Sequence, residues 1–530
     1  MKGFKRFLLI LFISFIPVNL SLWSDTEKTM PNKKLVIIGA GIGGLGAAGL
    51  FARKGYDVTV VEKNANLGGR ANIFEADGFK FDMGPSWYLA PDIFEHFFNL
   101  MGEKVEDHLD LKKLGPSYRI FFRNNGDPLD INSNLDIDTA TFDAIEPGAG
   151  DKLRAYLKQS EYQYEVATQH FMFKNYDRIW DFFNKRVMTE GQKLSVFSTM
   201  HKFVSRFFTS KKLQQVMEYT MVFLGTSPYE APALYNLMSH MDFNQGVFYP
   251  QGGFYELIKA LANIAEKNGA VLRANSPVEK IIVRDGKATG VRLEGGEVID
   301  ADLIISNADM WFTETKLLDI PQQTHKEKYW QKRTMAPSAF IMYLGVSENL
   351  PSLIHHNLLF SEDWRKNFDD IYKDPRLPDE PSLYVCAPSV TDPSVAPEGK
   401  ENLFVLVPIA SGLEISEAEK ERYADRVLAL MEAEMDLPGL REKIEYKRIY
   451  TVADFGVDYN AFKGSALGLA HTLRQTAIFR PKNQSKKVEN LFYVGAGTNP
   501  GIGTQICLIS AELAYKRVQG VTSAEPMERL

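Results

Sequence analysis

Cysteine is nearly absent from this chain. Cys386 and Cys507 are its two cysteines, and they lie far apart without a C-x-x-C pair. That pattern argues against a disulfide framework and against a zinc site, and it suits a reducing compartment. His355 and His356 are adjacent instead of four residues apart, which is a poor spacing for two metal ligands. We therefore expect no metal.

Excess charge and repetition are also missing. The chain has 61 Lys and Arg against 67 Asp and Glu, a net charge of −6, so nothing global indicates nucleic-acid binding. No internal repeat or low-complexity tract occurs. The hydrophobic share of 45% and the charged share of 24% are ordinary for a globular protein. At 530 residues the chain is long enough for more than one lobe.

The N-terminus carries a short apolar run. Three basic residues precede residues 7–16, and Pro17 follows them. This resembles a signal peptide or a short anchor, but a spanning helix needs about 20 apolar residues. Met30 would be a natural start directly before the first strand. We expect residues 1–29 to be either a signal-like or anchor-like extension, or a mis-assigned start.

The clearest positive signal is a strand–helix–strand unit. An apolar run at 35–38 leads into a glycine-rich turn, a small-residue helix and a second strand at 57–61. Gly39 permits the tight turn, Gly41 lets the backbone approach a pyrophosphate, and Gly44 lets the helix pack close to the sheet. The helix N-terminus attracts phosphate, and Glu62 stands where a carboxylate bonds a ribose hydroxyl. The unit predicts a dinucleotide site.

The residues after Glu62 distinguish between dinucleotides. Lys63 follows directly, and Gly68-Gly69-Arg70 comes shortly after. A glycine pair lets the backbone pass flat against a bulky ligand, and Arg70 offers a planar fork suited to phosphate. This segment resembles the FAD-binding signature of the flavin amine oxidase and carotenoid desaturase superfamily.

A second glycine-rich turn lies near the end of the chain. A strand at 490–494 leads to Gly495–Gly503, and a helix starts at Thr504. This is again the anion-binding arrangement, and its dipole would favour a reduced, anionic flavin. The turn is similar to the carotenoid desaturase element G-A-G-T-x-P-G-x-G. The family often continues with Pro-Gly, where this chain has Thr504–Cys507, a departure that concerns the substrate end more than FAD.

From about residue 33 to 517 the chain resembles the bacterial phytoene desaturases of the carotenoid and retinoid oxidoreductase family. Asp82-Met83-Gly84-Pro85-Ser86, Tyr249-Pro250-Gln251-Gly252-Gly253 and the segment 464–471 complete the ordered motifs. The resemblance implies FAD as the cofactor. It implies cofactor contacts at Gly39, Gly41, Gly44, Glu62, Lys63, Gly69, Arg70, Gly84, Pro85, Ser86, Val278, Asn307, Gly495, Ala496, Gly503, Thr504, Gln505 and Ile506.

The substrate side is marked less strongly. The family places the Tyr-Pro-x-Gly-Gly element near the substrate channel, which implies Pro250, Gly252 and Gly253 there. His240 lies just upstream, and a lone histidine beside apolar residues is more often structural. No catalytic acid or base can be assigned from the sequence.

The implied fold class is α/β. It combines a Rossmann-like FAD-binding domain, a mixed α+β substrate domain and a helical lobe that can face a membrane. A basic amphipathic helix within Leu194–Leu224 could lie on an anionic surface, or it could be a solvated face over an ordinary core. The expected division is extension 1–29, FAD-binding domain 30–90, helical or substrate lobe 91–245, FAD-binding domain 246–310, substrate domain 311–480, FAD-binding domain 481–520 and tail 521–530.

The resemblance implies oxidation of CH2–CH2 units of phytoene or a related acyclic carotene to CH=CH. A hydride leaves for the flavin, and the adjacent carbon loses a proton. The implied partners are that carotene, a lipid membrane surface, and O2 or a quinone as electron acceptor. The expected location is cytoplasmic and peripheral to the membrane, unless the N-terminal run anchors the chain.

Three alternatives remain on the same fold. A carotenoid isomerase would change double-bond geometry without net oxidation. A flavin amine oxidase or protoporphyrinogen oxidase would use another pocket. A lipid carrier resembling the GDP-dissociation inhibitors of prenylated GTPases would lack bound flavin.

Overall fold

The computed structural model describes residues 33–123, 126–177 and 198–530. The predictions for residues 1–29 lie outside the described residues, as does the start of the predicted basic helix. Lys33–Leu530 form one compact unit. Within the described part of the chain, no helix combines the length and the apolar character needed to cross a membrane.

A five-stranded parallel sheet positions the site. Its order is β19-β13-β1-β2-β9, and its strands are β1 (Lys34–Ile38), β2 (Asp57–Val61), β9 (Val271–Arg273), β13 (Leu303–Ser306) and β19 (Leu491–Tyr493). The chain runs from β1 to β2 on one side, whereas β13 lies on the other. Strand order therefore reverses at β1, which opens a crevice at the carboxyl ends of β1 and β13.

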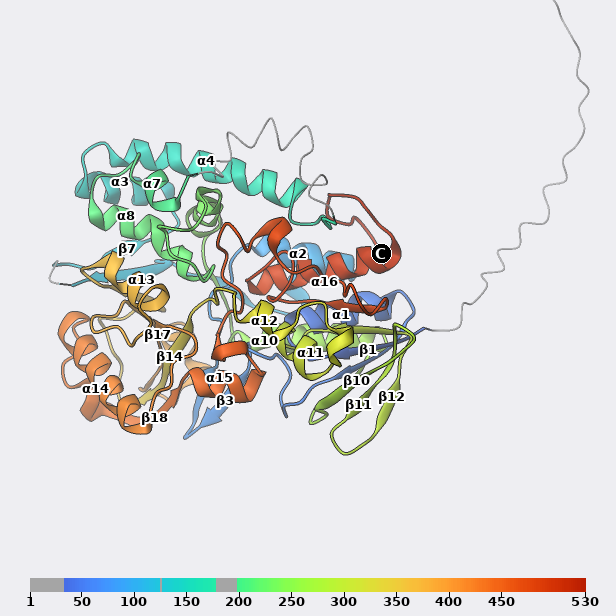
Figure 1. The fold of residues 1–530 in the computed structure, drawn as a ribbon. Helices are drawn as coiled ribbons and strands as arrows, with labels where there is room; N and C mark the ends of the chain where they lie inside the picture. The colour runs from blue at the N-terminus through green and yellow to red at the C-terminus, as the bar shows by residue number, and fades with distance from the viewer. Residues whose placement is uncertain (1–32, 124–125, 178–197) are drawn as a thin grey trace, which may run out of the picture. The chain divides into compact units, whose positions relative to one another are not determined.

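Both faces of this sheet are covered. Leu35 and Ile37 point toward helices α1 (Ile42–Arg53), α2 (Pro91–Leu100), α10 (Tyr255–Lys267) and α16 (Thr504–Gln519). Val36 and Ile38 point toward the antiparallel sheet of β10 (Val278–Arg284), β11 (Lys287–Leu293) and β12 (Val298–Asp300), and toward α11 (Met310–Lys316). Figure 1 shows α1, α2 and α16 together beside these strands. Burial on both faces explains why the strands read as unbroken apolar runs.

A second sheet has seven strands in the order β18-β14-β17-β16-β15-β6-β7. They are β6 (Tyr118–Phe122), β7 (Leu129–Ile131), β14 (Ser338–Val346), β15 (His356–Phe360), β16 (Leu383–Cys386), β17 (Glu401–Ile409) and β18 (Ile444–Tyr450). Helix α14 (Glu417–Glu434) packs against it. Together the two sheets confirm the predicted α/β class with a mixed second domain.

The stretch 91–245, expected to be helical, contains strands as well. β6 and β7 join the second sheet, and β5 (Leu111–Lys113) pairs with β8 (Phe248–Pro250). β6 pairs in parallel with β15, more than 200 residues away. Short strands that pair with such distant partners show little periodicity in the local sequence, so the sequence did not predict them. The expected domain bounds remain a prediction.

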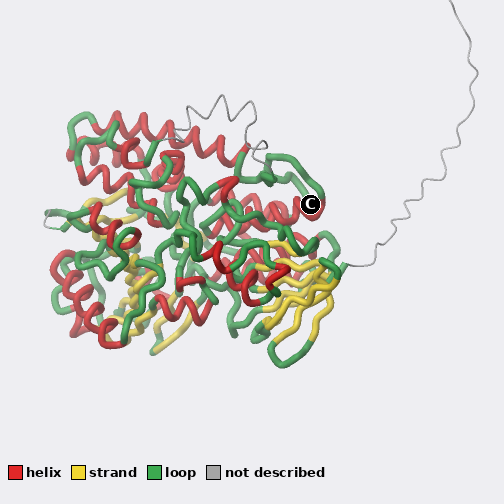
Figure 2. The backbone as a smooth tube through the Cα atoms, in the orientation of Figure 1, coloured by secondary structure: helices red, strands yellow, loops and turns green. Residues whose placement is uncertain are grey.

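Much of the described remainder of that stretch is helical, and Figure 2 shows helices together with two separate groups of strands. α3 (Leu135–Ile145) and α4 (Ala149–His170) are helices within the expected helical lobe, but the region around Lys202 does not form one long helix. α7 (Met200–Val204) and α8 (Lys211–Glu218) are separate and short. Phe203 and Phe208 are buried in the lobe core, so the described part of the segment favours the ordinary-core alternative.

The remaining short elements connect these layers. They are the hairpin β3 (Ile73–Ala76) and β4 (Phe79–Asp82), and helices α9 (Leu237–Ser239), α12 (Glu327–Trp330), α13 (Trp364–Tyr372) and α15 (Val452–Tyr459). A π-helical turn, His240–Gln245, follows α9.

Candidate active site

Both glycine turns open into the same cavity. Its volume is about 930 Å³, and it lies at the carboxyl ends of β1, β13 and β19. Gly39 and Gly41 line it from the first turn, and Gly495 and Gly503 line it from the last. The two motifs, at opposite ends of the described chain, therefore build one site.

The glycines are required by close packing. A Cβ added at Gly44 would lie 2.1 Å from the carbonyl oxygen of Gly39, so helix α1 could not rest against β1. The Asn307 amide fills the space between the two turns: a Cβ at Gly41 would lie 2.7 Å from its Nδ2, and one at Gly495 would lie 2.6 Å from its Oδ1. Asn307, just after β13, thus joins both turns.

Glu62 is held by backbone donors at the end of β2. It is buried and lines the cavity. Its Oε2 accepts from the Ala40 N–H at 2.9 Å, and its Oε1 accepts from the Asn64 N–H at 2.9 Å. These two bonds hold a carboxylate beside the first glycine turn.

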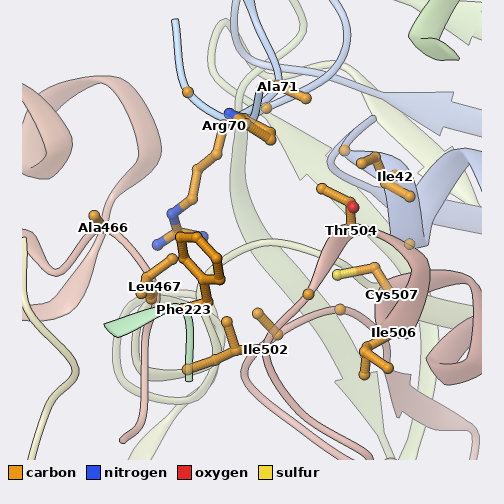
Figure 3. A pocket seen from close by; sticks show the side chains of 18 of the residues that line it. Ile42, Arg70, Ala71, Phe223, Ala466, Leu467, Ile502, Thr504, Ile506 and Cys507 are labelled. Atoms are coloured by element: carbon orange, nitrogen blue, oxygen red, sulfur yellow. The ribbon is translucent and has the colours of Figure 1, made fainter. Parts of the chain in front are cut away.

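Arg70 extends from the Gly68-Gly69 turn into the cavity. Figure 3 shows its side chain opposite Thr504 and Cys507 at the start of α16. Its Nη2 donates to the Ser465 carbonyl at 3.3 Å and lies 4.0 Å from Asp309 Oδ2. Its Nε is buried and has no hydrogen-bond partner among the described residues. The guanidinium therefore keeps a buried donor that an anionic or carbonyl-bearing ligand can satisfy.

Arg480 shapes the closing turn, although no sequence motif selects it. It is buried, and among the described residues its guanidinium donates to four backbone carbonyls: Nε to Thr498 at 2.9 Å, Nη1 to Gln475 at 3.4 Å, and Nη2 to Ala496 at 2.5 Å and to Leu469 at 3.3 Å. Burial lowers the pKa of Arg480 to about 10. It lies outside every glycine motif, so no local pattern marks it.

His471 fixes the other side of that turn. Its Nε2 accepts from the Ile502 N–H at 3.1 Å, and its Nδ1 lies 2.6 Å from the Tyr235 hydroxyl. Because a backbone N–H can only donate, the ring proton must sit on Nδ1 and point to Tyr235. The Tyr235 hydroxyl then donates to Thr476 Oγ1 at 2.6 Å. Burial, with Arg480 nearby, holds the pKa of His471 well below its ordinary value, so the ring is neutral.

Beyond the glycine turns the cavity wall becomes apolar. Helical segments around α9 and strand β15 supply part of this wall. Its side chains include Phe223, Leu237, Met238, Met241, Leu358 and Phe360. Such a surface accepts a guest without polar atoms and excludes water from it.

The predicted cofactor contacts gather here with one exception. Gly44 does not line the cavity and acts through helix packing; the remaining predicted cofactor positions all line it: Gly39, Gly41, Glu62, Lys63, Gly69, Arg70, Gly84, Pro85, Ser86, Val278, Asn307, Gly495, Ala496, Gly503, Thr504, Gln505 and Ile506.

The four positions expected near the substrate channel lie outside this lining. The Gly252 N–H donates to Asp392 Oδ2 at 2.6 Å, and Gly253 packs against Asp82. Asp82 in turn accepts from the first N–H groups of the α10 turn. Pro250 ends β8, so this element serves to begin α10. His240 stacks on Tyr164, which itself lines the cavity.

Comparison with known proteins agrees with this architecture. Residues 42–518 match the family of flavin-containing amine oxidoreductases. An oxidoreductase structure from Methanosarcina mazei is similar with a TM-score of 0.61 at 19% identity, covering 91% of this chain and all of that one. The chain therefore belongs to the flavin-containing amine oxidoreductases and has their fold.

Two curated proteins are more similar in sequence. A carotenoid 3,4-desaturase from Haloarcula japonica is 45% identical over 91% of this chain and 97% of its own length. A zeta-carotene-forming phytoene desaturase from Myxococcus xanthus is 38% identical over 92% of this chain and 94% of its own length. Within its family, the chain groups with the carotenoid desaturases, and it is an FAD-dependent oxidoreductase.

The residues present fit FAD. The two glycine turns line one cavity, the Glu62 carboxylate stands at the end of β2, and Arg70 keeps a buried donor. When bound, FAD supplies a two-electron oxidation.

Proposed function

We propose that this protein desaturates an acyclic carotene, converting CH2–CH2 units to CH=CH. One observation carries the proposal: the cavity that joins both glycine turns continues into apolar walls. A hydride acceptor and an apolar hydrocarbon can thus bind in the same cavity, whose apolar walls exclude water. The names of the two carotenoid-acting relatives support this substrate class.

The chain's own residues then have separable roles. The glycine turns, Glu62 and Arg70 hold the cofactor, and the N-terminus of α16 places a partial positive charge beside it. The apolar walls orient the polyene by shape. His471 is not a free base, because its Nε2 is occupied by Ile502 and its proton is directed at Tyr235.

Shape selection of a hydrocarbon is weak. A difference of one methylene is worth about 1–3 kcal/mol in an apolar pocket. We therefore assign the substrate class, phytoene-like acyclic carotenes, and not a chain length or a number of steps.

We further propose that the protein works at a lipid surface and passes its electrons to O2 or a quinone. The support is chemical: a carotene dissolves in lipid, and a reduced flavin must be reoxidised before the next turnover. Flotation with anionic liposomes tests the first part. Recovery of all activity in the lipid-free fraction would contradict it.

Expression in a phytoene-accumulating host, followed by pigment analysis, tests the reaction. We expect new coloured polyenes with more double bonds than the starting carotene. A change in geometry at constant mass would identify a carotenoid isomerase instead. An FAD-loaded protein that leaves every carotene unchanged would favour an amine oxidase or a protoporphyrinogen oxidase.

A further inference from the structure

A cluster of potential metal ligands lies behind the cavity wall. His356 at the start of β15 pairs directly with Cys386 at the end of β16, and His355 precedes the strand. One nitrogen of each ring and the Cys386 Sγ all lie within 4.8 Å of one another. All three side chains are buried, with exposures of 3%, 0% and 3% for His355, His356 and Cys386.

Each imidazole has one nitrogen engaged and one left over. His355 Nδ1 lies 2.9 Å from Thr391 Oγ1, and His356 Nδ1 lies 2.8 Å from the Tyr384 hydroxyl. Nε2 of each ring is buried and has no hydrogen-bond partner among the described residues. Two such atoms side by side are unusual, since buried polar atoms are nearly always paired. Metal-binding histidines show this division, with one nitrogen on the metal and the other hydrogen-bonded.

The donor chemistry selects a class of ion. Two imidazoles and one sulfur suit zinc(II) or copper(I) and do not suit magnesium or calcium.

We propose that His355, His356 and Cys386 bind one thiophilic metal ion, zinc(II) or copper(I). None of the three lines the cavity, but their neighbours do. The Trp87 ring stacks on His356 at 4.4 Å, and Tyr384 bonds both His356 and Ser86. The ion would therefore brace the cavity wall.

This inference revises the expectation of no metal. Two adjacent histidines are poorly spaced on a helix. Here they stand at the entry to a strand, and the third ligand comes from the neighbouring strand. Only the fold brings Cys386 to them. The inference does not depend on the substrate.

Metal analysis of the FAD-loaded protein tests it. The full chain is expressed in media supplemented with zinc, with copper or with magnesium, purified under reducing conditions, dialysed, and analysed by plasma mass spectrometry. We expect one zinc or copper ion per chain and no retained magnesium. Retention of neither zinc nor copper would overturn the proposal.

Variants locate the ion. Cys386→Ser and His355→Gln are expected to lower the retained metal at least about tenfold, whereas Cys507→Ser, which removes the other cysteine, keeps it. Circular dichroism and bound FAD report folding. If the variants fail to fold, X-ray absorption of the wild-type protein decides: one sulfur and two imidazole neighbours support the site, and a sulfur-free environment rejects it. Equal retention by folded Cys386→Ser also rejects it.

Discussion

Arg480 is a buried cation whose described hydrogen bonds go to backbone carbonyls. Replacing it by methionine leaves the carbonyls of Ala496 and Thr498 unpaired, at about 1–3 kcal/mol for each buried group. Because these carbonyls belong to the closing turn, we expect Arg480→Met to lower both the unfolding midpoint and the retention of FAD. Thermal unfolding and flavin absorbance measure the two effects. Arg474→Met, at an exposed position nearby, is the control; equal loss in both variants would contradict the assignment.

Asp242 gives stability a dependence on pH. It is buried, and the hydroxyls of Tyr118 and Tyr219 donate to its Oδ2 at 2.8 and 2.9 Å. Burial raises the pKa of Asp242 from 3.8 to about 7. As pH rises, the unfolded chain loses this proton before the folded chain does. The free energy of unfolding therefore falls between pH 3.8 and about 7, by up to about 1.4 kcal/mol per pH unit.

Asp242→Asn removes that titration. The variant's free energy of unfolding is therefore expected to fall less than that of the wild type between these two pH values. Denaturant titrations across this range, with FAD in excess, measure the difference. The exposed Asp300→Asn serves as control and keeps the wild-type slope. Parallel curves for Asp242→Asn and the wild type would show that Asp242 does not titrate in this window.

At the scale of an element, helix α1 offers a matched pair of glycines. A Cβ at Gly44 meets the Gly39 carbonyl at 2.1 Å, whereas a Cβ at Gly49 meets the flexible end of Met101 at 3.3 Å. Gly44→Ala is expected to push α1 from β1 and abolish FAD retention. Gly49→Ala should keep FAD and gain up to about 1 kcal/mol from helix propensity. Flavin content of the purified proteins decides, and FAD-loaded Gly44→Ala would refute the packing argument.

Some helices and strands could be predicted from local sequence patterns, and others could not. The unit β1-α1-β2 and helix α16 carry their own local signals, an apolar run, glycines at fixed spacing and a helix start, so both were predictable. β6 was not, because its partner β15 lies far along the chain. The role of Arg480 and the contact of His471 with Ile502 could not be predicted for the same reason, because both depend on loops that meet only after folding.

At the scale of the whole molecule, three distant chain segments build the sheet edge, and the helical lobe and second sheet close the cavity over it. We therefore expect cofactor binding and hydrocarbon binding to depend on different residues. A substitution in one half of the cavity should leave binding in the other half unchanged. This independence depends on the assembled fold and cannot be predicted from any single motif.

Leu237→Trp tests this division. Leu237 in α9 lines the apolar part of the cavity, and an indole there would occupy space that the polyene needs. We expect FAD retention to stay at the wild-type level and carotene turnover to drop at least about tenfold, since apolar pockets lose that much for small misfits. Ile137→Trp adds the same bulk at an exposed site on α3 and should change neither quantity. Liposome-delivered phytoene and flavin absorbance provide the two measurements. Loss of FAD in Leu237→Trp would mean that the two halves are one binding unit. Unchanged turnover would mean that the polyene does not bind beside Leu237.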